Sequence, residues 1–230
     1  MSDTAATTET LRAALLDAAL PHVAFDGWSE ETFRYAAQEA GIAPEQARLV
    51  CPRGAVDLAV DYHRRGDAEM AARLAEDPAP GLRFRDRVAR AVRLRLEGAD
   101  REVVRRGTVL FSLPQHAATG AQLIWGTADA IWTALGDTSD DLNWYSKRAT
   151  LSAVYGSTVL YWLGDDSPGQ AETWAFLDRR IEDVMRIETV KARVRENPVL
   201  GPLMAGPAKL AERIRKPRFT GDLPGRTAPR

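Results

Sequence analysis

The sequence predicts an all-α protein, and three observations support that prediction. Apolar residues recur at three- and four-residue spacing in segments rich in Ala, Leu, Arg and Glu. Short breaks of Gly, Pro, Asp and Ser separate these segments, whereas alternating strands joined by Asn-Gly-type turns are missing. With 230 residues, 45% of them hydrophobic, the chain can bury a core without disulfides. We expect helices over residues 8–24, 29–40, 44–50, 54–76, 82–97, 99–113, 117–135, 140–163, 168–194 and 199–215.

The first three helices (1–52) form a unit of the helix-turn-helix type. The turn Gly27-Trp28-Ser29 separates helices one and two, and Gly41 supplies the left-handed turn before helix three. This unit resembles the N-terminal headpiece of the TetR repressors, although a plain helical packing unit has the same features. Helix three offers only Gln46 and Arg48 for reading DNA, within a region (1–62) of net charge −6. We therefore expect no nucleic-acid partner.

The arginine-rich run within 82–97 is amphipathic, because Val88, Val92 and Leu96 follow helical spacing among the arginines. Acidic side chains lie within pairing reach, so the run indicates a solvated helix face rather than a nucleic-acid site. The arginines are Arg83, Arg85, Arg87, Arg90, Arg93 and Arg95.

Two later helices have well-marked beginnings. Ser167 precedes Pro168 at the first helical position, and Gln170 is placed to complete a capping box. Ser139 is placed to cap the helix over 140–163, whose Trp144 lies on one face with further aromatic residues.

The C-terminal residues combine an apolar stripe with clustered bases, and residues 191–230 carry a net charge of +7. This pattern is typical of a helix lying on an anionic membrane surface (197–216), although a basic helix packed on its own domain or on a dimer mate would look the same. A disordered tail (217–230) should follow. The expected membrane-binding residues are Leu200, Leu203, Lys209, Leu210, Arg213, Ile214 and Lys216.

Several classes of protein are excluded. The single Cys51 rules out a disulfide scaffold and a cysteine-ligated metal. The three histidines lack the spacing of helical metal sites, and no nucleophile elbow, phosphate loop or dinucleotide fingerprint occurs. We expect no metal, no cofactor and no catalytic residue. The N-terminal residues show neither a signal peptide nor a transit peptide, so we expect the chain to work where it is made.

Five segments together resemble a known family. They are residues 51–58 (CPRGAVDL), 62–67 (YHRRGD), 136–148 (GDTSDDLNWYSKR), 166–168 (DSP) and 174–177 (WAFL). The chain is similar over roughly 9–215 to the ninth Coq protein family of coenzyme Q (ubiquinone) biosynthesis, and the Asn-Trp-Tyr block is the most specific element.

The resemblance implies a TetR-like helical fold, usually dimeric, that binds an isoprenoid lipid instead of DNA and is not an enzyme. It implies an accessory protein that presents a quinone precursor to the demethoxyubiquinone hydroxylase. It also implies a partner-facing patch at Asp141, Asn143, Trp144, Tyr145 and Arg148. A bacterial member in the cytoplasm, peripheral at the inner face of the cytoplasmic membrane, is expected. The alternative is a TetR-type ligand-responsive transcriptional regulator.

The helices of the larger part (53–196) carry more large apolar and aromatic area than a bundle needs. A cavity lined by such groups would suit a polyprenyl tail, and a filled core is the alternative. The candidate lipid-binding residues are Phe111, Leu123, Trp125, Trp132, Tyr155, Trp162, Phe176 and Met185.

Overall fold

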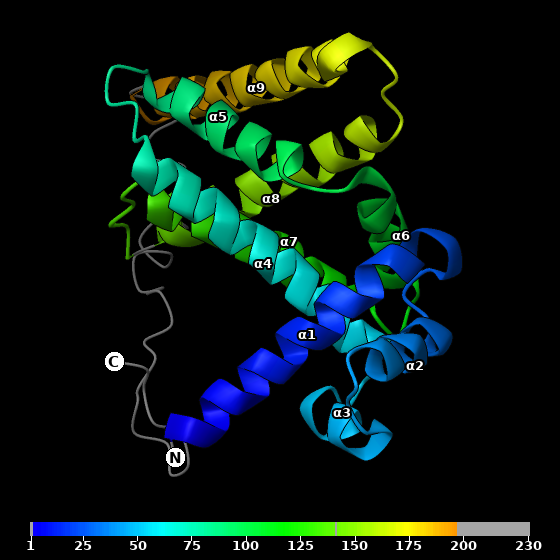
Figure 1. The fold of residues 1–230 in the computed structure, drawn as a ribbon. Coiled ribbons are helices and arrows are strands. Elements are labelled where there is room, and N and C mark those ends of the chain that lie inside the picture. Colours follow the sequence, from blue (N-terminus) through cyan, green and yellow to red (C-terminus); the bar gives the residue numbers. More distant parts are fainter. Residues whose placement is uncertain (1, 141, 197–230) are drawn as a thin grey trace.

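The computed structural model describes residues 2–140 and 142–196, with side chains over 7–140 and 143–186. The expected helix over 199–215, the tail and Asp141 lie outside the described residues. The described part contains nine α-helices, and no strand is assigned in it (Figure 1). The helices are α1 (Ser2–Asp26), α2 (Glu30–Glu39), α3 (Pro44–Val50), α4 (Ala55–Glu76), α5 (Phe84–Glu97), α6 (Arg101–Ser112), α7 (Ala117–Ala134), α8 (Leu142–Leu163) and α9 (Ala171–Glu196), with the 3-10 turn η1 (Pro168–Gln170) before α9.

The all-α prediction is confirmed, and local chemistry explains the N-terminal turns. Gly41 has φ 63°, the left-handed conformation in which glycine is favoured, and the N–H of Ile42 donates to the Ala37 carbonyl over 2.9 Å. Ser29 caps α2 by accepting from the N–H of Thr32 at 3.1 Å. The three-helix unit therefore begins and ends its second helix where the sequence indicates.

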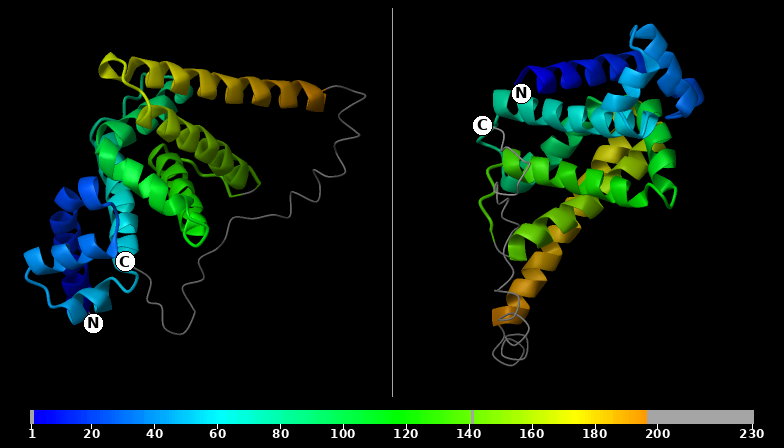
Figure 2. Two further views of the ribbon diagram at one scale, coloured as in Figure 1. Left: turned by 90° about the vertical axis from the view of Figure 1, so that its right-hand side faces the viewer. Right: turned by 90° about the horizontal axis from the view of Figure 1, so that it is seen from below.

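Two buried cores lie at either end of α4. Leu58 and Ala59, near its start, pack with α1, α2 and α3, whereas Met70 and Leu74, near its end, pack with α5, α7, α8 and α9. Figure 1 shows α4 crossing the molecule between these two groups of helices. In Figure 2 (left), α9 lies along one side of the larger group and its C-terminal end extends beyond it. The long α4 thus ties the N-terminal unit to the larger bundle.

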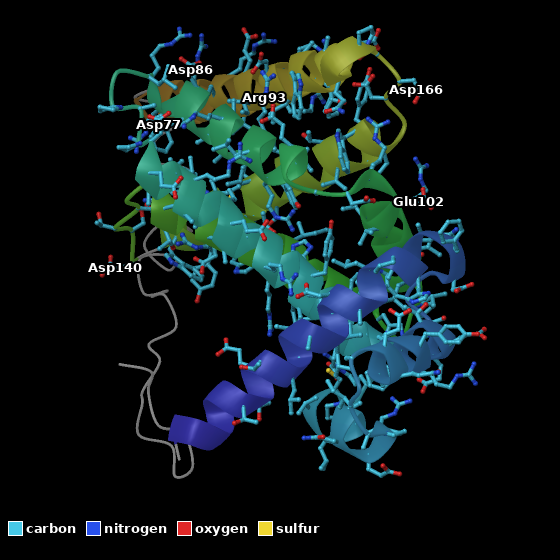
Figure 3. All side chains as sticks on the ribbon, in the orientation of Figure 1. Asp77, Asp86, Arg93, Glu102, Asp140 and Asp166 are labelled. Carbon is cyan, nitrogen blue, oxygen red and sulfur yellow. The ribbon has the colours of Figure 1, made fainter. Side chains whose placement is uncertain are left out.

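Most of the arginine run on α5 forms a solvated face of ion pairs, as expected. Arg83 pairs with Asp86 at 2.7 Å, Arg90 with Asp77 at 2.8 Å and Arg93 with Glu97 at 2.7 Å. Figure 3 shows Asp77, Asp86 and Arg93 around this helix. Arg95 contradicts the expectation, because its side chain is only 3% exposed and points into the bundle.

The beginning of α9 differs from the expected capping box. Gly169 adopts φ 62°, so Pro168–Gln170 forms a separate 3-10 turn and the α-helix begins at Ala171. Ser167 does cap α9, because its hydroxyl accepts from the N–H of Glu172 at 3.1 Å. Asp165 takes the place expected of Gln170: it accepts from the N–H of Thr173 at 2.9 Å and from its hydroxyl at 2.5 Å. These hydrogen bonds hold the pKa of Asp165 well below its ordinary value.

We expect Asp165→Ala to lower the midpoint of thermal unfolding by about 2–4 °C, because it removes a helix cap. Asp166→Ala is the matched control, since its side chain is fully exposed and projects from the same loop (Figure 3). Thermal melts followed by circular dichroism measure both. Equal midpoints for the two variants would contradict the capping role.

Candidate functional site

A cavity of about 410 Å³ lies between α4, α5, α6, α7 and α8, a volume within the range of small-molecule sites. Most of its wall is apolar, including Leu96, Val103, Phe111, Leu123, Ile124 and Val159. The lining residues that are exposed are Ser112, Ala117, Ala121 and Leu160, and these mark where the cavity opens, near the α6–α7 turn. The cavity can therefore take an apolar ligand from the surface.

Several polar side chains of the wall are already satisfied by backbone carbonyls. Thr108 donates to the Val104 carbonyl at 3.0 Å, and Ser112 donates to the Val109 carbonyl at 2.8 Å. The Trp28 indole N–H points to the Val103 carbonyl at 3.4 Å. These groups contribute little hydrogen-bonding capacity to a ligand.

Tyr62 also lines the cavity, and its hydroxyl accepts from the N–H of Asp100 at 3.0 Å. The other polar lining residues, His63, Arg95 and Tyr155, gather with Asp67 and Thr127 in one place, which we call the polar cluster. Arg95 Nε donates to Asp67 Oδ1 at 2.7 Å, and its Nη2 donates to the His63 carbonyl at 3.0 Å. Thr127 donates to Asp67 at 2.9 Å, its hydroxyl lies 2.8 Å from His63 Nε2, and it hydrogen-bonds with Tyr155. Helices α4, α5, α7 and α8 thus meet in one buried network.

Gly66 allows this network to form. A Cβ at Gly66 would lie 2.7 Å from Arg95 Nη1, a distance that real contacts do not reach. A glycine within a helix costs roughly 0.5–1 kcal/mol relative to alanine. Gly66 in the middle of α4 carries this cost, and its missing side chain lets the guanidinium of Arg95 pack directly on the Gly66 backbone.

Burial sets the protonation states of the cluster. It lowers the pKa of His63 from 6.5 to about 4, so this imidazole is neutral at pH 7. Burial also raises the pKa of Tyr155, which keeps its hydroxyl protonated. Burial would lower the pKa of Arg95, but the contact with Asp67 helps to hold it above its ordinary value, so Arg95 stays a cation. Its ion pair with Asp67 at 2.7 Å balances that charge.

The structure brings together three of the eight candidate lipid-binding residues. Phe111, Leu123 and Tyr155 line the cavity. The other five lie outside it: Trp125 packs on Trp144, Trp132 stacks on Phe84, Phe176 stacks on Tyr161, Trp162 is buried in the second core, and Met185 is 47% exposed. Aromatic content alone did not separate wall residues from core residues.

The expected partner-facing patch contains exposed and buried members. Asn143 is exposed, while Trp144 and Tyr145 are half-buried with their rings 4.8 Å apart. The Trp144 ring also meets Trp125 at 5.9 Å and has the Arg148 guanidinium over it at 4.1 Å. Tryptophan, tyrosine and arginine are the residue types enriched in interface hot spots, and this patch combines all three.

Arg148 itself is buried and positions this surface from within. Its Nε donates to Asp129 at 2.5 Å and its Nη1 to Asp137 at 3.0 Å. Lys147 also donates to Asp137, at 2.7 Å. Burial would raise the pKa of Asp137, but the hydrogen bonds from Lys147, Ser139 and Arg148 hold it well below its ordinary value. These ion pairs therefore fix the connection between α7 and α8. Because Arg148 is buried, it would affect a partner protein by positioning Trp144 and not by direct contact.

The expected membrane-binding residues, from Leu200 to Lys216, lie outside the described residues. Within the described part, no helix is both long and apolar enough to span a bilayer. No group of three or more His, Cys, Asp or Glu suited to a metal ion occurs among the described residues either.

Sequence reasoning missed Asp67, Thr127 and the separate role of Arg95. Arg95 belongs to an amphipathic run for which the sequence predicts a solvated face, so its burial was not expected. The usable signal was Gly66-Asp67 in the middle of a helix, because a glycine there indicates a close approach by another group.

We predict that His63→Gln flattens the dependence of stability on pH between 6.5 and 4. The unfolded chain takes up a proton on His63 near pH 6.5 and the folded chain near pH 4. Stability is therefore full above pH 6.5 and falls by about 3 kcal/mol as the pH drops through this window. Urea titrations at several pH values measure the slope. His116→Gln should keep the wild-type slope, and an unchanged slope in His63→Gln would show that His63 does not cause it.

Comparisons with known proteins agree with the resemblance seen in the sequence. Residues 117–188 match the COQ9 family model. The chain is 31% identical over 189 residues to the mitochondrial ubiquinone biosynthesis protein COQ9 of Drosophila melanogaster, covering 80% of this chain and 58% of that protein. It is 29% identical to the corresponding protein of Homo sapiens, over 78% of this chain and 59% of that protein. The chain thus spans about three fifths of the length of these relatives.

A solved structure shows the same fold. The TetR transcriptional regulator from Nitrosomonas europaea superimposes with a TM-score of 0.59 at 20% identity, covering 75% of this chain and 97% of that one. The TetR-like architecture expected from the N-terminal unit is therefore confirmed. The chain is a homologue of the COQ9 proteins of ubiquinone biosynthesis.

Proposed function

We propose that this protein is a non-enzymatic accessory protein of ubiquinone biosynthesis that binds an isoprenoid quinone precursor and presents it to a ring-modifying hydroxylase. The observation that carries the proposal is the largely apolar cavity of about 410 Å³, in a chain similar to COQ9 proteins over four fifths of its length. A prenyl chain has the shape and polarity that such walls accept.

A transcriptional regulator is the weaker alternative, because its reading helix is poorly equipped. Helix α3 has seven residues, and the guanidinium of Arg48 is paired with Glu30 and lies 4.8 Å over the Phe33 ring. Glu31 and Glu45 are exposed on the same unit. Acidic groups there oppose the phosphate contacts on which DNA affinity depends.

The patch around Trp144 is the proposed docking surface for the hydroxylase. Trp144 contacts Trp125, which follows the cavity-lining Leu123 and Ile124 on α7. Cavity and patch therefore share one helix, and a partner seated on Trp144 would lie close to the wall of the cavity. We propose that the demethoxyubiquinone hydroxylase, or an equivalent enzyme of the pathway, is this partner.

Membrane association and a homodimer complete the proposal. Leu160 is 63% exposed on the cavity rim, and Leu113, 41% exposed, follows the rim residue Ser112. Apolar groups at an opening suit loading of a lipid from a bilayer surface. The proposed location is peripheral, at the inner face of a bacterial cytoplasmic membrane, with the basic segment 197–216 as the anchor.

We expect Gly156→Leu to abolish co-purification of lipid. Gly156 lines the cavity and a Cβ there meets only Ile124 at ordinary contact distance, so a leucine would fill the space without breaking the helix pair. Gly126→Leu is the control, because a Cβ at Gly126 meets nothing within 4 Å and the residue does not line the cavity. Native mass spectrometry and solvent extraction measure the bound lipid. Lipid-free wild-type protein from several preparations would refute the proposal.

We expect Trp144→Lys to abolish co-purification of the co-expressed hydroxylase while leaving the melting midpoint within a few degrees, because a half-exposed side chain is lost without opening the core. Phe25→Lys, which changes an 81% exposed aromatic residue of the N-terminal unit, should retain the partner. Unfolded Trp144→Lys protein would assign Trp144 to the core. A stable variant that still binds the hydroxylase would remove the patch from the proposal.

A further inference from the structure

The polar cluster is an unusual feature for the wall of a lipid cavity. Arg95 lines the cavity although its side chain is only 3% exposed, and Asp67, its partner, is 13% exposed. Removing charges from water is costly, and an apolar wall of similar volume would serve a hydrocarbon ligand as well. The placement of a charged, hydrogen-bonded network at a surface that otherwise repels water points to a ligand with a polar group.

The charges of the cluster restrict what that group is. The positive charge of Arg95 is balanced by Asp67 at 2.7 Å, so it is not free for an anion. His63 is neutral at pH 7, and Tyr155 keeps its proton. A phosphate entering here would lose its hydration without gaining an unpaired cation. An uncharged group with a hydrogen-bonding oxygen meets no such penalty.

Hydrogen-bonding capacity is still present at the cavity surface. Tyr155 lines the cavity. Because Thr127 gives its one hydroxyl proton to Asp67, the bond between Thr127 and Tyr155 uses the Tyr155 proton, and the Tyr155 oxygen can still accept a hydrogen bond. His63 also lines the cavity, 20% of its side chain is exposed, and its Nε2 is held by Thr127 at 2.8 Å. Thr127 thus orients both groups, and its hydroxyl is the centre on which the arrangement depends.

We propose that the polar cluster is a head-group subsite: Tyr155 and His63, oriented by Thr127, surround the uncharged ring hydroxyl of a prenylated phenol, which donates to one of their free acceptor atoms, while the prenyl chain extends along the apolar wall toward the opening. This inference deepens the proposed function and rests on it. The lipid then enters head first, and its ring stays out of water until it is handed over. The chain leaves past Phe111 and Leu160, at the end of α6 and on α8.

Three probes with the same two-isoprene chain test this orientation: a geranylated phenol, geranylbenzene, which is the matching hydrocarbon without the hydroxyl, and geranyl phosphate. Binding to the full chain is measured by calorimetry or by quenching of tryptophan fluorescence. We expect wild-type protein to bind the phenol at least about tenfold more tightly than either other probe, which corresponds to one well-formed hydrogen bond in a buried site.

Two variants and one control locate the preference. Tyr155→Phe and Thr127→Val should each reduce it to about threefold or less while leaving the affinity for the hydrocarbon unchanged. Thr158→Val is the matched control, because Thr158 is a buried threonine of α8 that bonds only the Val154 carbonyl and does not line the cavity. If Thr127→Val fails to fold, Tyr155→Phe decides alone, since it removes one hydroxyl and keeps the ring.

The outcomes separate this inference from the proposed function. Binding of all three probes with equal affinity, or a preference that survives both variants, overturns the head-group subsite and leaves a lipid-binding protein. Tightest binding of geranyl phosphate overturns it in favour of an anion site. No binding of any probe overturns both the subsite and the proposed function.

Discussion

The ion pair between Arg95 and Asp67 is the interaction on which the larger half of the molecule depends. It joins α4 to α5, and through Thr127 and Tyr155 it reaches α7 and α8, the four helices that enclose the inner part of the cavity. Losing one partner of such a buried pair costs roughly 3–5 kcal/mol, because the other charge is left uncompensated. The pair therefore fixes the positions of the cavity walls as well as its polarity.

A second buried arginine, Arg148, organises the aromatic patch on α7 and α8. Arg148 on α8 forms ion pairs with Asp129 on α7 and with Asp137 in the connection between the two helices. Its guanidinium also stacks on the Trp144 ring. The cavity and the aromatic patch are thus each anchored by an arginine that is itself 3% exposed. This shared construction explains how one short helical hairpin can present a surface to a partner and a wall to a ligand without deforming.

Sequence reasoning reached the fold for a physical reason, whereas the patch around Trp144 came from the family resemblance and stays a prediction. Helical periodicity, Gly41 and the cap at Ser29 act locally, so the chain displays them directly. The cavity depends instead on which helices cross and on where a glycine leaves space between them, as at Gly66 and Gly156. Trp162 and Tyr155 lie on one face of α8 and both belong to the second core, yet only Tyr155 also lines the cavity. Only the tertiary arrangement distinguishes them, and it also separates Arg95 from its exposed neighbours.

The most direct test of the whole account is the position of a bound ring. A crystal structure of the full chain with a prenylated phenol that carries bromine on its ring would locate the head by anomalous scattering. The account predicts the bromine at the buried end of the cavity, beside Tyr155 and His63, with the chain running toward Leu160. A bromine peak at the opening with the chain buried beside Tyr155, or a ligand outside the cavity, would contradict it.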